Sequence, residues 1–175
     1  MALLVVTGPP GAGKSTVARI VAHHFDPSVL VDGDAFFGFV ECGFIEPWLA
    51  GSHEQNDIVV QAAAAAAGRF TVGGYTTVYD GVLGPWFLPT FMAASGLASL
   101  HYALLIPPVD ECVERVTTRR DHGFSDEAAT RQMHDHFARA DVDARHVLLD
   151  LPGDANAVAA EVLTRFGDGS LVYET

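Results

Sequence analysis

Basic residues are scarce in this sequence. Lysine and arginine together number 10 among 175 residues, against 22 acidic residues, so the formal net charge is −12 at pH 7. A surface of that charge repels the phosphates of nucleic acids and the head groups of anionic lipids. The composition therefore argues against nucleic acids and membranes as partners.

Cysteine is equally scarce, with Cys42 and Cys112 far apart in the chain. The first residues have neither the basic segment nor the apolar length of a secretory signal. Because cysteines in a reducing compartment seldom pair, we expect two free thiols and a cytoplasmic protein.

Long uninterrupted hydrophobic runs are also missing. The most apolar stretch, residues 87–106, contains proline, glycine and serine. A membrane-spanning helix needs about 20 predominantly apolar residues without such breaks. We expect this stretch to form a helix, a turn and a strand of a soluble protein.

What the chain does contain is a regular alternation of short apolar runs and longer helical segments. Strands are predicted at residues 3–7, 28–31, 76–79, 100–106 and 146–149, and helices at residues 13–24, 54–70, 86–94, 110–119, 125–141 and 155–166. Strands that are apolar throughout and separated by helices are typical of a parallel sheet covered on both faces. We expect a single α/β domain over residues 1–175, built as a three-layer sandwich.

The only lysine of the chain lies in the segment GPPGAGKST, directly after the first predicted strand. Gly8, Gly13, Lys14 and Ser15 match the pattern G-x-x-x-x-G-K-[ST], in which backbone N–H groups and a helix N-terminus surround phosphates. The lysine reaches the β- and γ-phosphates, and the serine hydroxyl binds Mg²⁺. The predicted nucleotide-binding loop, or phosphate loop, comprises Gly8, Pro9, Pro10, Gly11, Ala12, Gly13, Lys14, Ser15 and Thr16.

Three aspartates come just after predicted strands. Asp32 and Asp34 follow the second strand, and Asp80 follows the third. Because ligands bind beyond the carboxyl ends of parallel strands, we expect all three beside the phosphate loop. The simpler alternative is that the Asp-Gly-Asp segment only forms a turn, as both residue types commonly do.

The segments GPPGAGKST, VLVDGDAFF and YTTVYDGV resemble the small P-loop kinases, which include shikimate kinase, gluconate kinase and chloramphenicol phosphotransferase. The resemblance covers most of the chain. It implies a P-loop NTPase fold of the adenylate-kinase-like type, with a five-stranded parallel sheet in the order 2-3-1-4-5. It also implies a small, mobile helical lid that bears arginines, here at about residues 115–135.

The resemblance implies roles for individual side chains. The acid that matches Asp34 contacts the acceptor hydroxyl and serves as the catalytic base, which agrees with the need for one carboxylate that accepts the hydroxyl proton. The acid that matches Asp32 lies near the metal and its waters, and Asp80 corresponds to an acid that holds magnesium-bound water. Which of these two is the main partner of the metal stays open.

Lid arginines of related kinases contact ATP and stabilise charge on the transferred phosphoryl group. Arg119 and Arg131 match that pattern best, Arg119 as a catalytic residue and both as ATP-binding residues. The alternative for each is a surface arginine near a helix end.

The acceptor pocket is expected to include Asp34 and the helix that follows it. No lysine or arginine occurs between Arg19 and Arg69, whereas enzymes usually hold anionic acceptors with arginine. The candidate acceptor-binding residues are Asp34, Phe37, Trp48, Asn56, Gly81 and Trp86. Apolar and aromatic walls suit an uncharged or weakly cationic alcohol, such as an antibiotic, although most of these aromatic side chains are equally compatible with the core.

These features predict a kinase that transfers the γ-phosphate of ATP to a hydroxyl group of a small molecule, with Mg²⁺ near Ser15, Asp32 and Asp80. One alternative is a nucleoside or nucleotide kinase, against which the missing arginines argue. Another is a non-catalytic ATP-binding module with a regulatory or resistance role. Neither the acceptor nor the oligomeric state follows from the sequence.

Overall fold

The protein is built around one β-sheet. The computed structural model describes residues 1–118, 124–149 and 153–174. The strands of the sheet are β1 (Leu3–Thr7), β2 (Ser28–Asp32), β3 (Thr76–Asp80), β4 (Ser99–Leu105), β5 (Val147–Leu148) and β6 (Val172–Glu174). The first five run parallel in the order β2-β3-β1-β4-β5, so the predicted strand order is confirmed.

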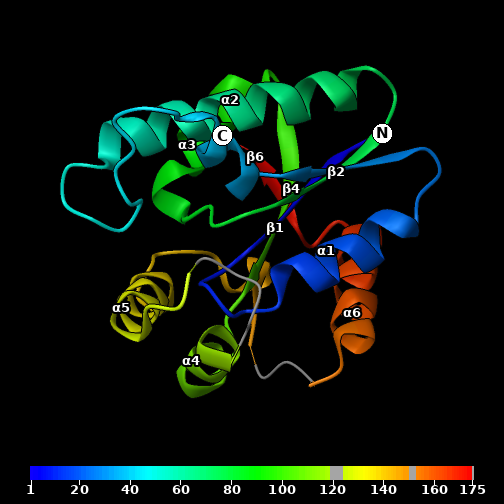
Figure 1. Ribbon diagram of the computed structural model, residues 1–175. Helices are drawn as coiled ribbons and strands as arrows, with labels where there is room; N and C mark the ends of the chain where they lie inside the picture. The colour runs from blue at the N-terminus through cyan, green and yellow to red at the C-terminus, as the bar shows by residue number, and fades with distance from the viewer. Residues whose placement is uncertain (119–123, 150–152, 175) are drawn as a thin grey trace.

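Helices cover both faces of the sheet (Figure 1). They are α1 (Lys14–His23), α2 (His53–Val72), α3 (Leu88–Ser95), α4 (Val109–Thr118), α5 (Glu127–Ala138) and α6 (Ala155–Gly167). Alternate residues of β1 pack to opposite sides: Leu3 and Val5 join the cluster under α2 and α3, and Leu4 and Val6 join the cluster under α1 and α6. Burial on both faces explains why this strand is apolar throughout, and the α/β three-layer architecture is confirmed.

Short elements were not predicted. A 3-10 helix, Asp34–Phe39, directly follows β2, and a second one, Pro85–Phe87, precedes α3. Strand β6 pairs antiparallel with the first half of β4, while β5 pairs parallel with its last residues. The 3-10 helices and β6 are too short to carry a periodic pattern that a sequence could reveal, whereas β5 lies within the strand predicted at residues 146–149.

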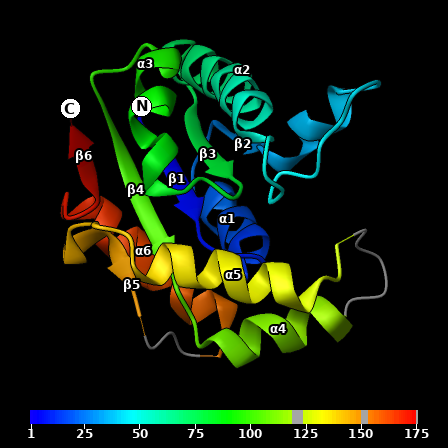
Figure 2. The same ribbon diagram turned by 90° about the vertical axis from the view of Figure 1, so that its left-hand side faces the viewer.

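Helices α4 and α5 lie side by side beyond the carboxyl ends of the strands (Figure 2). The range expected to form the lid includes the end of α4 and most of α5. Helix α5 begins at Glu127 because the Asp126 side chain accepts a hydrogen bond from the Ala129 N–H at 2.9 Å, which caps the helix. The predicted catalytic residue Arg119 lies outside the described residues.

The structure bears on the two cysteines and on the apolar segments of the chain. Both cysteines are free thiols: Cys42 is exposed, and Cys112 is buried in α4, where burial raises the pKa of its thiol to about 11. Among the helices that the structure describes, none has the length and apolar character that crossing a membrane requires.

Candidate functional site

The glycine-rich loop between β1 and α1 fits closely against its neighbours. Gly8 has φ +149°, and a Cβ atom at this position would lie 2.2 Å from the Leu105 carbonyl oxygen. Gly11 has φ +79°, and a Cβ atom there would lie 2.2 Å from the carbonyl oxygen of Cys112 in α4. Both the backbone conformation and the space therefore require glycine. The loop ends at α1, whose N-terminus is the element that favours anions.

Lys14 is the first residue of α1 and is buried, with 7% of its surface exposed. Its ammonium group donates a hydrogen bond to the Pro9 carbonyl oxygen at 3.0 Å, so the side chain folds back across the loop. Burial raises the pKa of Asp80, and the charge of Lys14 opposes that rise. The single lysine thus lies inside the loop that the motif predicts to hold phosphate.

The three aspartates meet at one edge of the sheet. In the pairing of β2 with β3, Asp32 stands opposite Asp80. The backbone N–H of Gly33 donates to the Asp80 carbonyl oxygen at 2.7 Å, and the N–H of Val82 donates to the Asp34 carboxylate at 3.3 Å. The Asp32 carboxylate accepts a hydrogen bond from the Ala35 N–H at 3.2 Å, at the start of the 3-10 helix.

Glycine is needed between the two aspartates because of Tyr79. A Cβ atom on Gly33 would lie 2.1 Å from the Tyr79 hydroxyl oxygen. Tyr79 is buried, and burial together with the charges of Asp34, Asp80 and Asp32 raises the pKa of its hydroxyl. The Tyr79 hydroxyl therefore stays protonated near the three aspartates.

Asp80 has the properties of an outer ligand for hydrated Mg²⁺. Its Oδ1 atom is buried and has no hydrogen-bond partner, which is costly unless a ligand supplies one. Burial raises the pKa of Asp80, while a hydrogen bond from the Ser15 hydroxyl and the charge of Lys14 oppose that rise. Within the described residues, no group of three or more His, Cys, Asp or Glu side chains is arranged to hold a metal. A hydroxyl and one carboxylate fit a Mg²⁺ ion that arrives with a nucleotide and keeps several waters.

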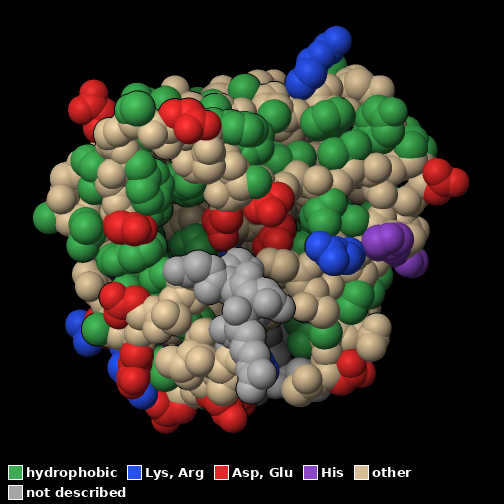
Figure 3. Space-filling view, in the orientation of Figure 1, with side chains coloured by type: hydrophobic (Ala, Val, Ile, Leu, Met, Phe, Trp, Pro, Cys, Tyr) green, Lys and Arg blue, Asp and Glu red, His purple; other side chains and the backbone are tan. Residues whose placement is uncertain are grey.

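A cavity of about 1060 Å³ opens beside the phosphate loop. Four loop residues line it, namely Pro10, Gly11, Lys14 and Ser15. Figure 3 shows a hollow near the centre of this face, with acidic side chains at its edge and hydrophobic side chains next to it. The cavity therefore joins the candidate phosphate site to an apolar region.

Most of the predicted acceptor-binding residues line this cavity. Those on its wall are Asp34, Phe37, Trp48, Asn56 and Trp86. The predicted residues that are not on its wall are Gly81, Asp32, Asp80, Arg131 and, within the phosphate loop, Gly8, Pro9, Ala12, Gly13 and Thr16. Lys14, at the start of α1, and Asp34, at the start of the 3-10 helix after β2, thus line the same cavity.

Comparison with known proteins gives matches in structure but not in sequence. No protein family matches the chain, and no curated protein is similar to it in sequence. Among solved structures, a sugar kinase from Janibacter sp. HTCC2649 matches with a TM-score of 0.71 at 19% identity, over 95% of each chain. The Deinococcus radiodurans tunicamycin resistance protein matches with a TM-score of 0.69 at 14% identity, over 95% of each chain. Shikimate kinase from Acinetobacter baumannii matches with a TM-score of 0.62 at 19% identity, over 98% of this chain and 96% of its own.

The matches extend over nearly the whole chain, and their fold agrees with the observed strand order. The chain has the fold of the small P-loop kinases. The structural resemblance to this group is therefore confirmed. A fourth match, the APS kinase of Mycobacterium tuberculosis, was solved in complex with AMPPNP and APS (TM-score 0.68, 16% identity, 95% of this chain and 97% of its own). A protein of this P-loop kinase fold thus binds an ATP analogue.

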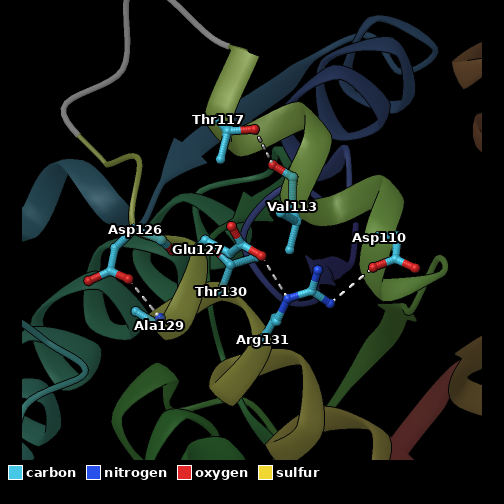
Figure 4. A network of polar contacts seen from close by, with 8 residues as sticks. All are labelled: Asp110, Val113, Thr117, Asp126, Glu127, Ala129, Thr130 and Arg131. Carbon is cyan, nitrogen blue, oxygen red and sulfur yellow. Dashed lines mark hydrogen bonds and ion pairs between the residues drawn. The ribbon is translucent and has the colours of Figure 1, made fainter.

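The arginines of α4 and α5 differ in their contacts. Figure 4 shows Arg131 between two carboxylates, with Nη1 3.0 Å from Asp110 of α4 and Nε 3.0 Å from Glu127 of α5. Arg115, which was not selected, instead donates a hydrogen bond from Nη1 to the Gly11 carbonyl oxygen at 3.3 Å. Among the described residues, Arg115 thus contacts the phosphate loop, and Arg131 joins the two helices to each other.

Sequence reasoning also missed a wall of the cavity. Helix α5 and the three residues before it contribute Phe124, Ser125, Asp126, Gln132, Met133, His136 and Phe137. The rings of Phe124 and Trp48 lie 4.7 Å apart between centroids, so this segment contacts the loop before α2. No motif or periodicity in the sequence marks that contact, since it joins segments far apart in the chain.

The aromatic side chains near the cavity differ in whether they pack in the core or line the cavity wall. Phe87 does both, since it belongs to the core cluster and stacks on His53 at 5.3 Å in the cavity wall. Phe36 packs against the core, and Phe39 is 75% exposed. Phe87 therefore contributes to both the core and the cavity wall, Phe36 to the core, and Phe39 to neither.

Proposed function

We propose that the chain is an ATP-dependent phosphotransferase that moves the γ-phosphoryl group of ATP to a hydroxyl group of a small molecule. The observation that carries this proposal is that Lys14 and Asp34 line the same cavity. One group neutralises phosphate charge and the other accepts a proton, which are the two requirements of phosphoryl transfer. The match to several small-molecule kinases supports it.

The reaction assigns one task to each side chain. The oxygen of the acceptor hydroxyl forms a bond to the γ-phosphorus, and the Asp34 carboxylate accepts the proton of that hydroxyl. The bond between that phosphorus and the oxygen bridging to ADP breaks, and ADP leaves. Lys14 and the loop N–H groups stabilise the charge on the phosphate oxygens. Mg²⁺, when bound near Ser15 and Asp80, supplies further charge neutralisation.

The cavity favours an acceptor that is uncharged or weakly cationic. Within the described residues, Lys14 is the only lysine or arginine on its wall, whereas three carboxylates, of Asp34, Glu46 and Asp126, lie on it. An anionic acceptor would meet like charges there, and none of the described wall residues offers a guanidinium to bind it. The aromatic rings offer an apolar surface for an organic molecule. An antibiotic is one such acceptor, and the match to the tunicamycin resistance protein is compatible with it.

The test is a screen of hydroxyl compounds that are neutral, cationic or anionic. Each is incubated with Mg-ATP and examined by mass spectrometry for the mass of one added phosphoryl group. Binding is followed separately by fluorescence, because the chain has two tryptophans, Trp48 and Trp86, and both line the cavity. We expect phosphorylation of a neutral or cationic alcohol. Phosphorylation of nucleoside monophosphates alone would overturn the acceptor class, and ATP binding without any turnover would favour a non-catalytic module.

A further inference from the structure

The loop that follows β3 is anchored at Leu83. The Leu83 N–H donates a hydrogen bond to the Thr7 hydroxyl at 2.8 Å and a longer one, at 3.1 Å, to the Gly81 carbonyl oxygen. The Thr7 hydroxyl donates in turn to the Leu83 carbonyl oxygen at 3.0 Å. A second hydroxyl, that of Tyr102 in β4, donates to the same carbonyl oxygen at 2.9 Å. One peptide segment is thus held from two strands of the sheet.

These anchors are shielded from water. Thr7, Leu83 and Tyr102 each have 0% of their surface exposed. Burial raises the pKa of the Tyr102 hydroxyl, so it stays protonated and remains a donor. Hydrogen bonds in such surroundings are strong, and a partner left unsatisfied there is costly. The position of Leu83 is therefore tightly defined.

The anchored segment holds Asp34. The residue directly before Leu83 is Val82, whose N–H donates to the Asp34 carboxylate at 3.3 Å. Asp34 itself is exposed, at the start of a short 3-10 helix, so its own surroundings restrain it little. The direction of the Val82 N–H, and with it the direction of this carboxylate, depends on how Leu83 is held.

Thr7 connects the anchored segment around Leu83 to the phosphate loop. It is the last residue of β1 and directly precedes Gly8, where the loop begins. Phosphoryl transfer requires the acceptor oxygen and the γ-phosphorus to lie in a near-attack geometry, and an error of about 1 Å can cost on the order of 100-fold in rate. We propose that Thr7 is a positioning residue that sets the separation between the phosphate loop and Asp34, a role that rests on the proposed phosphotransferase function.

The test replaces Thr7 with valine, which keeps the shape of the side chain and removes its hydroxyl. The turnover of Mg-ATP alone is measured, with water in place of the acceptor hydroxyl. We expect kcat to fall by about 10- to 100-fold with an unchanged KM for ATP, because the phosphate loop keeps its own residues. Hydrogen exchange at the Val82 and Leu83 amides is expected to become faster. Thr7→Ser retains the hydroxyl and is expected to restore both properties.

The matched control is Thr77→Val in the neighbouring strand β3. Thr77 is also 0% exposed, but its hydroxyl has no hydrogen-bond partner, so its removal is expected to leave turnover and amide exchange unchanged. If Thr7→Val does not fold, Tyr102→Phe removes one of the two donors to Leu83, and a smaller fall in kcat with an unchanged KM for ATP is expected.

The outcomes separate the two proposals. A wild-type protein that binds ATP without turnover overturns the phosphotransferase function, and the role of Thr7 falls with it. An active wild type whose Thr7→Val variant has the kcat and amide exchange of Thr77→Val overturns the role of Thr7 alone. Equal loss of kcat and of ATP binding, without faster exchange at Val82, also overturns it, since that pattern indicates general damage.

Discussion

Replacement of Lys14 by alanine is expected to lower ATP turnover by about 100- to 1000-fold, the cost of removing one charged group that stabilises a transition state. Lys14 is the only lysine of the chain and is largely buried within the phosphate loop. No neighbouring lysine can replace its charge. We expect weaker ATP binding as well, because the proposed site uses the same charge to bind the nucleotide before reaction. Turnover and ATP affinity are measured on the same preparation.

The control for this variant is Arg19→Ala, which removes a positive charge from the exposed side of the same helix. It is expected to behave as the wild type. The single lysine permits a second measurement, since an amine-directed reagent has only Lys14 and the N-terminal amino group as targets. Bound Mg-ATP is expected to protect Lys14 and leave the terminus reactive. Modification of Lys14 at equal rates with and without ATP would contradict its assignment.

Asp34→Asn is expected to lower the rate of phosphoryl transfer by about 100- to 10,000-fold, the range observed for loss of a positioned general base. The amide keeps the size of the side chain but cannot accept the hydroxyl proton at neutral pH. ATP affinity is expected to stay nearly unchanged, because the Asp34 carboxylate accepts a hydrogen bond from the Val82 N–H and not from the phosphate loop. Rates are measured at saturating Mg-ATP.

The matched control is Asp141→Asn, since Asp141 is exposed and does not line the cavity. It removes one negative charge from the same acidic protein and is expected to have no effect on the rate. A fully active Asp34→Asn variant would show that another group accepts the proton, and loss of ATP binding in it would indicate that Asp34 acts on the nucleotide.

The alternation of strands and helices and the position of the glycine-rich loop could be predicted because their signals are local, whereas the strand order followed from the resemblance to the small P-loop kinases. The loop pattern around Lys14 lies within nine residues, and the aspartates follow strands whose carboxyl ends must meet at one edge. The register that places Asp32 opposite Asp80 agrees with that argument. Helix and strand bounds were close for the same reason, since buried strands and amphipathic helices differ in period.

The parts that escaped prediction depend on tertiary packing. Whether Arg115 or Arg131 contacts the phosphate loop is decided by how α4 lies on Gly11 and by the carboxylates that hold Arg131. The contact of Trp48 with Phe124 joins two loops that no pattern relates. The hydrogen bonds between Thr7 and Leu83 likewise depend on a buried register between distant segments. Neither the type of these residues nor their spacing in the sequence distinguishes them from ordinary surface or core residues.

The most direct test of the account is a crystal structure of the protein with Mg²⁺ and AMPPNP. The account predicts the β- and γ-phosphates inside the loop from Gly8 to Ser15, with the Lys14 ammonium group on them. It also predicts the Asp34 carboxylate facing the terminal phosphate across the cavity. A nucleotide bound elsewhere, or an Asp34 side chain turned away from that phosphate, would contradict it.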